Sequence, residues 1–330
     1  MAKLHLSLAC GDYLLTQPLL DGTVQPEGID LTCFPLFPEE MFFRMAVHQE
    51  FDVSEMSMST FLLARERGEP AVAGIPVFPN RAFRHGYIFA NVQSGIDRPQ
   101  DLAGKRVGIG EYQLTACLWI RGFLQDEYGV RPDSIHWYVE RPEKVEVYVP
   151  GIRIEQMPPG ENMSTMLEKG VVDAVLGPNI PECFLQGSPN VRRLIPHYHE
   201  VEMDYFQRTG IFPIMHTLVV RSEVVEGHPW APYSVFKAFS EAKEIAFERV
   251  QGGVQLWAPF LRGEGLEAAL GVLGRDYWPY GVEGNRKVLE TVARYSHEQG
   301  LTTARAGVDS LFAPSTAYQW DDYKRVVSSK

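Results

Sequence analysis

Apolar and polar residues alternate in some stretches of the chain and recur every three or four positions in others. Residues 3–9 (KLHLSLA) alternate, which predicts a β-strand, and residues 29–34 have the composition of a second strand. The run from Glu39 to His48 has helical spacing, as does "STFLLARERG", which Gly68 would end. This order of strands and helices predicts an α/β fold with mainly parallel strands.

The pattern continues further along the chain. A strand is predicted at 105–109, and it leads into a long helix that ends near Gly129. Another helix stops at Gly170 and an apolar strand follows it. The stretch "IFPIMHTLVVR" is apolar at both alternating sets of positions, which is typical of a central strand covered on both faces. From Pro229 onward the spacing is mostly helical.

Length and charge narrow the classes of protein. A chain of 330 residues exceeds the comfortable size of one hydrophobic core, so two domains are expected. Lys and Arg number 31 against 42 Asp and Glu, a net charge of -11, which argues against nucleic acid as a partner. No apolar run is long enough to span a bilayer, and "MAKLHLSLACGDY" lacks the pattern of a secretory signal. We therefore expect a cytoplasmic protein, with four widely spaced cysteines that form neither a zinc site nor a disulfide framework.

Positive charge is concentrated in one stretch, "NRAFRHGYIFAN" at residues 80–91. If residues 81–89 are extended, Arg81 and His85 share one face and Arg84 points to the other. A guanidinium binds a carboxylate with two hydrogen bonds, and an imidazole moves protons near neutral pH. Arg81 and His85 are therefore predicted as a functional pair and Arg84 as a salt-bridge partner. The alternative is a solvated edge strand with incidental charges.

Small or polar residues also follow three of the predicted strands, the first of which ends in Gly11-Asp12-Tyr13. Ligands of open parallel sheets bind beyond the carboxyl ends of the strands, where hydroxyls and helix N-termini suit anions. Glu55 and Ser59 lie at the end of the third strand, and Glu111, Tyr112 and Thr115 follow the strand at 105–109. These residues are candidates for substrate binding. Taken singly, Ser59 and Thr115 are also compatible with ordinary helix N-caps.

His216 lies inside the apolar strand "IFPIMHTLVVR". A histidine in such a strand needs a partner for its ring N–H, and it is either a catalytic residue or a satisfied core residue. The pair His197 and His199 has a metal-site spacing but no clear third ligand, so no metal site is predicted, although the sequence leaves assistance by a divalent metal open. No motif demands nicotinamide, flavin or pyridoxal phosphate, so no cofactor is predicted either.

Three long segments bring in a family resemblance. "AGKRVGIGEYQLTACLWIRGFLQDEYGV", "RTGIFPIMHTLVVR" and "YWPYGVEGNRKVLETVARYSHEQGL" resemble the 4,5-dihydroxyphthalate decarboxylase family. The resemblance implies a two-lobed, type II periplasmic-binding-protein-like α/β fold with a ligand cleft between the lobes. Residues 1–92 and 217–330 would form a discontinuous first lobe with C-terminal helices, and residues 93–216 the second.

The resemblance also implies an activity. The family decarboxylates 4,5-dihydroxyphthalate to protocatechuate in phthalate degradation, which the chemistry of the substrate allows through acid/base-assisted protonation of the ipso carbon without a cofactor. On this reading Arg81 anchors a carboxylate, and His85 and His216 divide the acid and phenol-activating roles in either order. The other candidates, which would contact the rest of the aromatic dicarboxylate, are Glu55, Ser59, Arg84, Glu111, Tyr112 and Thr115. A homo-oligomer is compatible with the sequence, and neither a nucleic acid nor a membrane partner is expected.

Three other functions fit the same pattern. The chain is compatible with a solute-binding protein for an aromatic acid, or with a decarboxylase of a related hydroxylated aromatic acid. A thiamine-pyrimidine synthase on the same fold would require an active-site lysine and pyridoxal phosphate. The aromatic stretch "WPYG" at residues 278–281 suits either a wall over the ligand or a packing role.

Overall fold

The computed structural model describes residues 2–143, 145, 147, 149–251, 271–274 and 276–317. The chain divides into two compact units. The first comprises Met1–Arg81, Ile214–Glu290 and Ala306–Lys330, and the second comprises Ala82–Pro213 and Thr291–Arg305. The divisions therefore fall at Arg81/Ala82 and Pro213/Ile214 rather than at the predicted 92/93 and 216/217. Within the described part of the chain, no helix combines the length and apolar character that crossing a membrane requires.

The first unit contains a five-stranded sheet in the order β2-β1-β3-β11-β4. The strands are β1 (Leu4–Cys10), β2 (Ile29–Pro35), β3 (Val53–Ser57), β4 (Val72–Ile75) and β11 (His216–Arg221). Strand β1 runs parallel to β2 and β3, whereas β11 runs antiparallel to β3 and β4. The helices are α1 (Gln17–Leu20), α2 (Pro38–His48), α3 (Met58–Arg67), α8 (Ser222–Gly227) and α9 (Ala231–Gln251), with 3-10 turns η5 (Glu283–Asn285), η6 (Val308–Ser310) and η7 (Pro314–Thr316).

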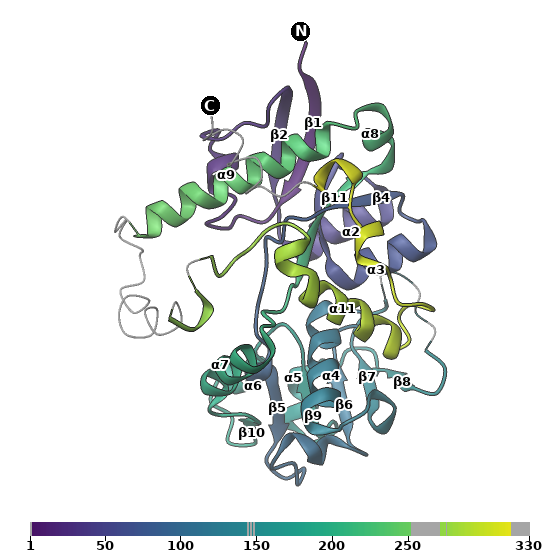
Figure 1. The fold of residues 1–330 in the computed structure, drawn as a ribbon. Coiled ribbons are helices and arrows are strands. Elements are labelled where there is room, and N and C mark those ends of the chain that lie inside the picture. Colours follow the sequence, from purple (N-terminus) through teal and green to yellow (C-terminus); the bar gives the residue numbers. More distant parts are fainter. Residues whose placement is uncertain are drawn as a thin grey trace. The chain divides into compact units, whose positions relative to one another are not determined.

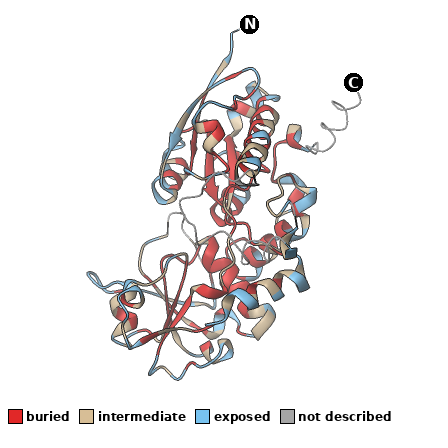
Figure 2. Cartoon of the chain, turned by 90° about the vertical axis from the view of Figure 1, so that its left-hand side faces the viewer, coloured by how far each residue is buried: buried red, intermediate tan, exposed pale blue. Residues whose placement is uncertain are grey.

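Helix α9 covers one face of the sheet in the first unit (Figure 1). Its apolar residues, including Phe236 and Phe239, pack against β1, β3 and β11 through Leu8, Val53 and Leu218. Buried residues, red in Figure 2, follow the strands of both sheets. This core fixes which side chains of β3 face α9, because successive strand residues alternate between the two faces.

The second unit contains a six-stranded sheet in the order β10-β5-β9-β6-β7-β8. The strands are β5 (Ile88–Asn91), β6 (Arg106–Ile109), β7 (His136–Val139), β8 (Arg153–Gln156), β9 (Ala174–Leu176) and β10 (Val191–Arg193). Strands β9, β6, β7 and β8 are parallel, and β5 is antiparallel to both β9 and β10. The helices are α4 (Thr115–Tyr128), α5 (Met163–Glu168), α6 (Glu182–Leu185) and α7 (Tyr198–Thr209), with η1 (His85–Tyr87), η2 (Pro99–Leu102) and η3 (Pro132–Ser134). The division between the units falls within α11 (Arg286–Glu298).

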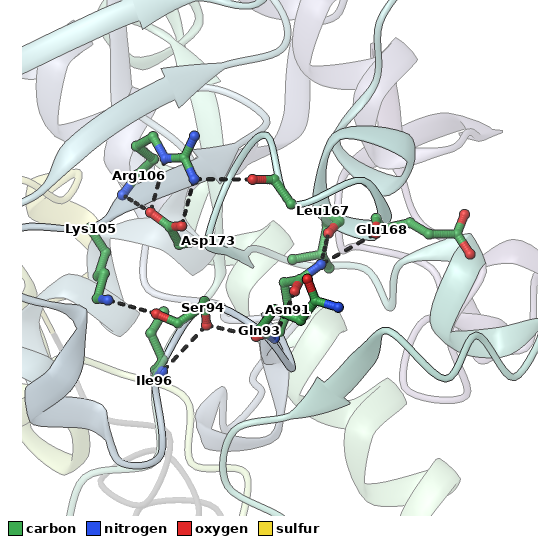
Figure 3. A network of polar contacts seen from close by, with 10 residues as sticks. Asn91, Gln93, Ser94, Ile96, Lys105, Arg106, Leu167, Glu168 and Asp173 are labelled. Atoms are coloured by element: carbon green, nitrogen blue, oxygen red, sulfur yellow. Dashed lines mark hydrogen bonds and ion pairs between the residues drawn. The ribbon is translucent and has the colours of Figure 1, made fainter.

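A polar network stabilises the amino ends of β6 and β9 (Figure 3). Arg106, at the start of β6, donates two hydrogen bonds to the Asp173 carboxylate, at 2.7 and 3.1 Å. Asn91, at the neighbouring end of β5, donates to the carbonyl of Leu167 at 2.8 Å. These bonds lie at the sheet end opposite to the carboxyl ends of β6 and β9, where ligands of parallel sheets bind. We therefore assign the network to the scaffold.

Most predicted elements are present, including the helix ends. Gly68 and Gly129 follow α3 and α4 with φ of 74° and 68°, a left-handed conformation that favours glycine. The stretch "IFPIMHTLVVR" supplies β11, which lies between two other strands as predicted, although the strand begins only at His216.

The prediction of an extended segment at 81–89 is wrong. Residues 82–84 form no regular strand, His85–Tyr87 form the 3-10 turn η1, and β5 begins at Ile88. The two-residue period therefore does not hold across this stretch, and it does not place Arg81 and His85 on a common face. Arg81 belongs to the first unit and His85 to the second.

Candidate active site

A fully buried carboxylate lies in the middle of the sheet of the first unit. Glu55 belongs to β3, has no exposed surface and pairs with Leu218 of β11. It alternates with Ser54 and Met56, so its side chain shares a face with Val53, which packs in the α9 core. A charge at such a position is stable only when hydrogen-bond donors surround it.

Three donors meet the Glu55 carboxylate. The backbone N–H of Gly11 donates to Oε2 at 2.9 Å, and the Tyr13 hydroxyl lies 2.9 Å from Oε1. His216 Nδ1 lies 2.5 Å from the same Oε1. Gly11 and Tyr13 follow the carboxyl end of β1, and His216 opens β11, so donors from two segments distant in sequence converge on the carboxylate of β3.

Gly11 allows Tyr13 to reach this carboxylate. A Cβ atom at position 11 would overlap the ring and hydroxyl of Tyr13. The ring therefore lies directly over the glycine, which no residue with a side chain permits without displacement. The sequence Gly-Asp-Tyr after β1 thus lets the Tyr13 hydroxyl reach the Glu55 carboxylate.

Glu55 also fixes the state of the His216 ring. A carboxylate accepts hydrogen bonds, so Nδ1 carries a proton, which leaves Nε2 as the nitrogen able to exchange one. Within the part of the chain that the structure describes, Nε2 makes no hydrogen bond. The Phe42 ring of α2 packs edge-on against the imidazole, with centroids 4.8 Å apart, and the His216 side chain keeps 14% of its surface exposed. The result is an oriented histidine with one nitrogen available to a ligand.

The other ionisable groups around Glu55 are held in their neutral forms. Burial, reinforced by the charge of Glu55, raises the pKa of the Tyr13 hydroxyl well above its usual range. The same two causes raise the pKa of the buried Cys10 thiol. At neutral pH, Tyr13 therefore remains a hydrogen-bond donor to Glu55, and Cys10 does not act as a thiolate nucleophile.

Ser57 and Ser59 lie next to this cluster. Ser57 pairs with His216 across β3 and β11, and its hydroxyl oxygen is 3.2 Å from that of Ser59. Neither Ser59 nor Thr115 is a helix N-cap, because α3 begins at Met58 after Ser57 and α4 begins at Thr115 after Leu114. The alternative interpretation of both residues as N-caps is therefore wrong.

The structure places the Arg81 side chain inside the first unit. Its guanidinium donates to the carbonyl of Pro279 at 2.8 Å and to the side chain of Asn285, and the residue is 6% exposed. Burial lowers the pKa of Arg81 to about 9. These contacts attach the 279–285 segment to Arg81 and favour a structural role over carboxylate anchoring.

His85 is buried in the second unit. Its ring stacks on Phe123 at 4.1 Å and tilts against Tyr205, with 2% of the residue exposed. Burial lowers the pKa of His85 to about 4, so the imidazole is neutral at neutral pH. Its Nδ1 has no hydrogen-bond partner among the described residues and lies 4.0 Å from Glu202. This environment suits packing, and it favours His216 over His85 as the residue that moves protons.

The remaining candidates also belong to the second unit. Tyr112 is fully buried, with its hydroxyl bonded to the carbonyl of Gln299 at 3.2 Å, so it is a core residue. Glu111 is 2% exposed and lies 3.4 Å from the Nε of Arg141. Thr115 is buried at the first turn of α4. Arg84 donates to the carbonyl of Pro178 at 3.2 Å, and its role in a salt bridge stays a prediction.

A pocket of about 180 Å³ lies at the carboxyl ends of β6 and β9 in the second unit. Gly110, Arg141, Asn162, Ser164 and Gly177 contribute to its lining. Of the predicted site residues, Glu111 adjoins it through Arg141, whereas Tyr112 and Thr115 do not line it. Over the described ranges, no three His, Cys, Asp or Glu side chains are grouped so that they could hold a metal ion.

The aromatic stretch at 278–281 packs within the first unit. Trp278 donates its indole N–H to the carbonyl of Phe78 at 2.7 Å, and the neighbouring Tyr277 stacks on Phe247 of α9. These contacts favour the packing interpretation over a wall around a ligand.

The sequence marked Gly11, Asp12 and Tyr13 as one of three strand ends that could meet at a cleft, but neither Gly11 nor Tyr13 was predicted as a site residue. The signal was the Gly-Asp-Tyr sequence at that strand end. Its importance depends on Glu55, 42 residues away from Tyr13, which only the fold brings within hydrogen-bond distance. The predicted requirement that His216 have a partner for its ring N–H is confirmed by Glu55.

Two α/β units joined by a chain that passes repeatedly between them define the class of type II periplasmic-binding-protein folds. The predicted fold class is confirmed by solved structures. The periplasmic sulfonate-binding protein SsuA of Methylobacillus flagellatus matches 99% of this chain and 96% of its own, with a TM-score of 0.57 at 12% identity. The desulfurization enzyme DSZB matches 99% of this chain and 100% of its own, with a TM-score of 0.53 at 15% identity. Because this fold is found in both a binding protein and an enzyme, it does not define an activity.

Comparison of sequences, unlike comparison of folds, identifies a family with a defined activity. The chain is 38% identical over 325 residues to 4,5-dihydroxyphthalate decarboxylase of Comamonas testosteroni, covering 96% of this chain and 98% of that protein. It is 40% identical over 214 residues to 4,5-dihydroxyphthalate decarboxylase of Pseudomonas putida, covering 63% and 83% respectively. No family model matches the chain. The protein belongs to the 4,5-dihydroxyphthalate decarboxylase family and is a carboxy-lyase.

Proposed function

We propose that the protein converts 4,5-dihydroxyphthalate to 3,4-dihydroxybenzoate and carbon dioxide. The observation that carries the proposal is the 38% identity to the Comamonas testosteroni decarboxylase over nearly the whole of both chains. The cluster of Glu55, Tyr13 and His216 supports it, because this reaction requires a positioned group that exchanges protons.

The substrate defines the chemistry. Each carboxyl group stands para to one hydroxyl, so removal of that phenolic proton directs electrons through the ring to the carbon that bears the carboxylate. Protonation of this carbon gives a dearomatised intermediate. Its bond to the carboxylate then breaks, the electron pair returns to the ring, and carbon dioxide leaves. Overall, one proton replaces one molecule of carbon dioxide on the ring.

We assign the exchangeable proton to Nε2 of His216. In the neutral ring, Nε2 accepts the phenolic proton, and the imidazolium that forms is stabilised by the Glu55 carboxylate 2.5 Å from Nδ1. The ring carbon takes up a proton from solvent, and after carbon dioxide leaves, Nε2 returns its proton to the phenolate of the product. Tyr13 and Gly11 hold Glu55 in place through its two oxygens. On this assignment Glu55 and Tyr13 are positioning residues, and His216 is the catalytic residue.

Replacement of the histidine tests the assignment. His216→Asn should lower kcat by about 10²–10⁴-fold, because general acid–base catalysis contributes an effect of that size. His5→Asn is the matched control, since His5 also pairs with a carboxylate of the first unit, Asp30 at 3.0 Å, but with 82% of its side chain exposed. The control should keep the activity of the unmodified protein. Near-normal turnover by His216→Asn would overturn the assignment.

A second experiment tests the reaction itself. Turnover in D₂O should yield 3,4-dihydroxybenzoate with one deuterium at the carbon that lost the carboxylate, measured by NMR, with one equivalent of carbon dioxide released. Tight binding of 4,5-dihydroxyphthalate without carbon dioxide release would instead identify a binding protein and contradict the proposal.

A further inference from the structure

Arg193, the last residue of β10, lies among aromatic rings, and its charge acts on the Glu202 carboxyl without forming a close ion pair. Its guanidinium carbon lies 4.6 Å from the ring centroid of Tyr198, 4.9 Å from that of Phe89 and 5.5 Å from that of Phe184. Within the described ranges, its side chain makes no hydrogen bond and no ion pair. The aromatic faces hold the cation in place but leave its N–H donors unsatisfied, and a half-buried guanidinium in that state favours an anionic ligand.

The guanidinium lines a pocket of about 290 Å³, all of whose lining residues belong to the second unit. Aromatic side chains make up much of the wall: Phe83, Tyr87, Tyr198 and Phe212. Phe83 and Phe212 stack on each other at 4.6 Å. The volume lies near the lower end of the range for ligand sites, which suits a single aromatic ring.

Glu202 of α7 supplies an ionisable carboxyl group to this pocket, and burial raises its pKa to about 7. It is 6% exposed, and its carboxyl accepts a hydrogen bond from the backbone N–H of Gly86 at 3.3 Å. Glu202 and Arg193 form no ion pair, so the pocket presents a cation and a carboxyl group at separate positions. A carboxylate of the ligand would bind Arg193, whereas a second carboxylate would meet Glu202. A hydroxyl group would instead be able to donate to Glu202.

We propose that Arg193, Glu202 and the surrounding aromatic residues form a binding site for a small aromatic monocarboxylate. The ligand's carboxylate pairs with Arg193, and its ring lies among the aromatic side chains. The site differs from the Glu55–His216 cluster, none of whose residues lines the pocket. The product of the proposed reaction has this chemistry, but the inference depends only on the pocket.

Adjacent arginines provide a matched pair of variants. Arg192 precedes Arg193 in β10 but points to the other face, where it pairs with Asp97 at 2.6 Å. Benzoate and 3,4-dihydroxybenzoate are titrated by calorimetry into the full-length protein, Arg193→Met and Arg192→Met, after equal melting temperatures show that all three are folded. Arg193→Met should weaken binding at one site by about tenfold or more, because charge-assisted hydrogen bonds are lost. Arg192→Met should bind as the unmodified protein does.

Phthalate tests the role of Glu202. It should bind this site more weakly than benzoate, and Glu202→Gln should reduce the difference. Equal benzoate affinities in the two arginine variants would overturn the proposal, since ligand bound elsewhere is unaffected by either change. A rise in KM for 4,5-dihydroxyphthalate in Arg193→Met at unchanged kcat would assign the pocket to the reacting dicarboxylate, which would also overturn it. The titrations with benzoate, 3,4-dihydroxybenzoate and phthalate measure binding without turnover. Their outcome is therefore independent of the proposed activity.

Discussion

At the scale of single residues, the arrangement around Glu55 explains why one carboxylate is buried in an apolar core. Donors from the Gly-Asp-Tyr sequence after β1 and from β11 satisfy it, and the imidazole of His216 is oriented in return. The cost of burying the charge is offset only when all these donors are present. The residues of this cluster should therefore respond together to substitution.

Glu55→Gln retains the shape of the side chain and removes its charge. We expect kcat to fall by at least about 10²-fold, because the amide no longer stabilises a protonated imidazole, while KM changes little. Steady-state kinetics measure both quantities. Asp30→Asn, at the exposed partner of His5, is the control and should have no effect on kcat. A large rise in KM with normal kcat would instead assign Glu55 to substrate binding, as the sequence predicted.

Gly11→Ala should displace the Tyr13 ring, because a Cβ atom would overlap it. We expect a loss of stability of about 1–3 kcal/mol, typical of overpacking, together with a fall in kcat. Tyr13→Phe should lower kcat with a smaller loss of stability, since it removes only the hydroxyl. Gly227→Ala, where no atom lies within 4 Å of the added Cβ, serves as the control in thermal unfolding. A stable, fully active Gly11→Ala protein would contradict the role given to this glycine.

At the scale of elements, the 3-10 turn η1 depends on contacts that the local sequence does not contain. The stretch Arg81–Phe89 has the alternation of a strand, but the His85 ring stacks on Phe123 of α4 and the Gly86 N–H donates to Glu202 of α7. These partners lie far along the chain, so spacing alone predicted a strand and a pair of aligned side chains that do not exist. By contrast, the helices that end at Gly68 and Gly129 have local signals and were predicted correctly.

The contact between η1 and α7 predicts how the stability of the protein depends on pH, because Glu202 and His85 both have shifted pKa values. Burial raises the pKa of Glu202 from 4.5 to about 7, so the folded state retains a proton that the unfolded chain loses, and stability falls as pH rises from about 4.5 to 7. Burial lowers the pKa of His85 from 6.5 to about 4, so stability falls as pH drops from about 6.5 to 4. The two effects oppose each other over most of this range.

Single substitutions should separate the pH dependence of stability due to Glu202 from that due to His85. Glu202→Gln should leave a protein that loses about 1–3 kcal/mol between pH 6.5 and pH 4, and His85→Phe one that loses a similar amount between pH 4.5 and pH 7. Urea unfolding of each variant and of the unmodified protein at pH 5 and pH 7 measures these changes. Parallel pH dependence in all three proteins would contradict the environments described for both groups.

At the scale of the whole molecule, the sequence was sufficient for the fold class but not for the division into units. Alternating strands and helices, with the family resemblance, predicted two α/β units. The second unit, however, also takes Thr291–Arg305 from near the end of the described chain. The predicted helix at this point is present, but periodicity does not show that a helix contributes to two cores. The same limit applies to the site, where His216 was identified but its partners Glu55 and Tyr13 were not assigned to it.

Gln299 shows how the segment Thr291–Arg305 stabilises the second unit. Its side chain accepts a hydrogen bond from Arg121 at 2.7 Å and donates to the carbonyl of Leu118 at 2.9 Å, both inside α4. Gln299→Met should cost about 1–3 kcal/mol, because a buried guanidinium N–H and a carbonyl lose their partners. Gln125→Met, which removes an exposed bond to Glu298, should be nearly neutral in denaturant unfolding. Equal stability of the two variants would contradict this account.

The convergence of Tyr13 and His216 on one oxygen of Glu55 gives the protein an internal optical probe. When the imidazole takes up a proton, Oε1 shifts electron density toward the new cation and binds the phenol less strongly. The O–H vibration and ultraviolet absorption of Tyr13 should therefore change in step with the charge on His216. Difference spectroscopy during turnover would follow the histidine's proton through a neighbour that does not itself ionise.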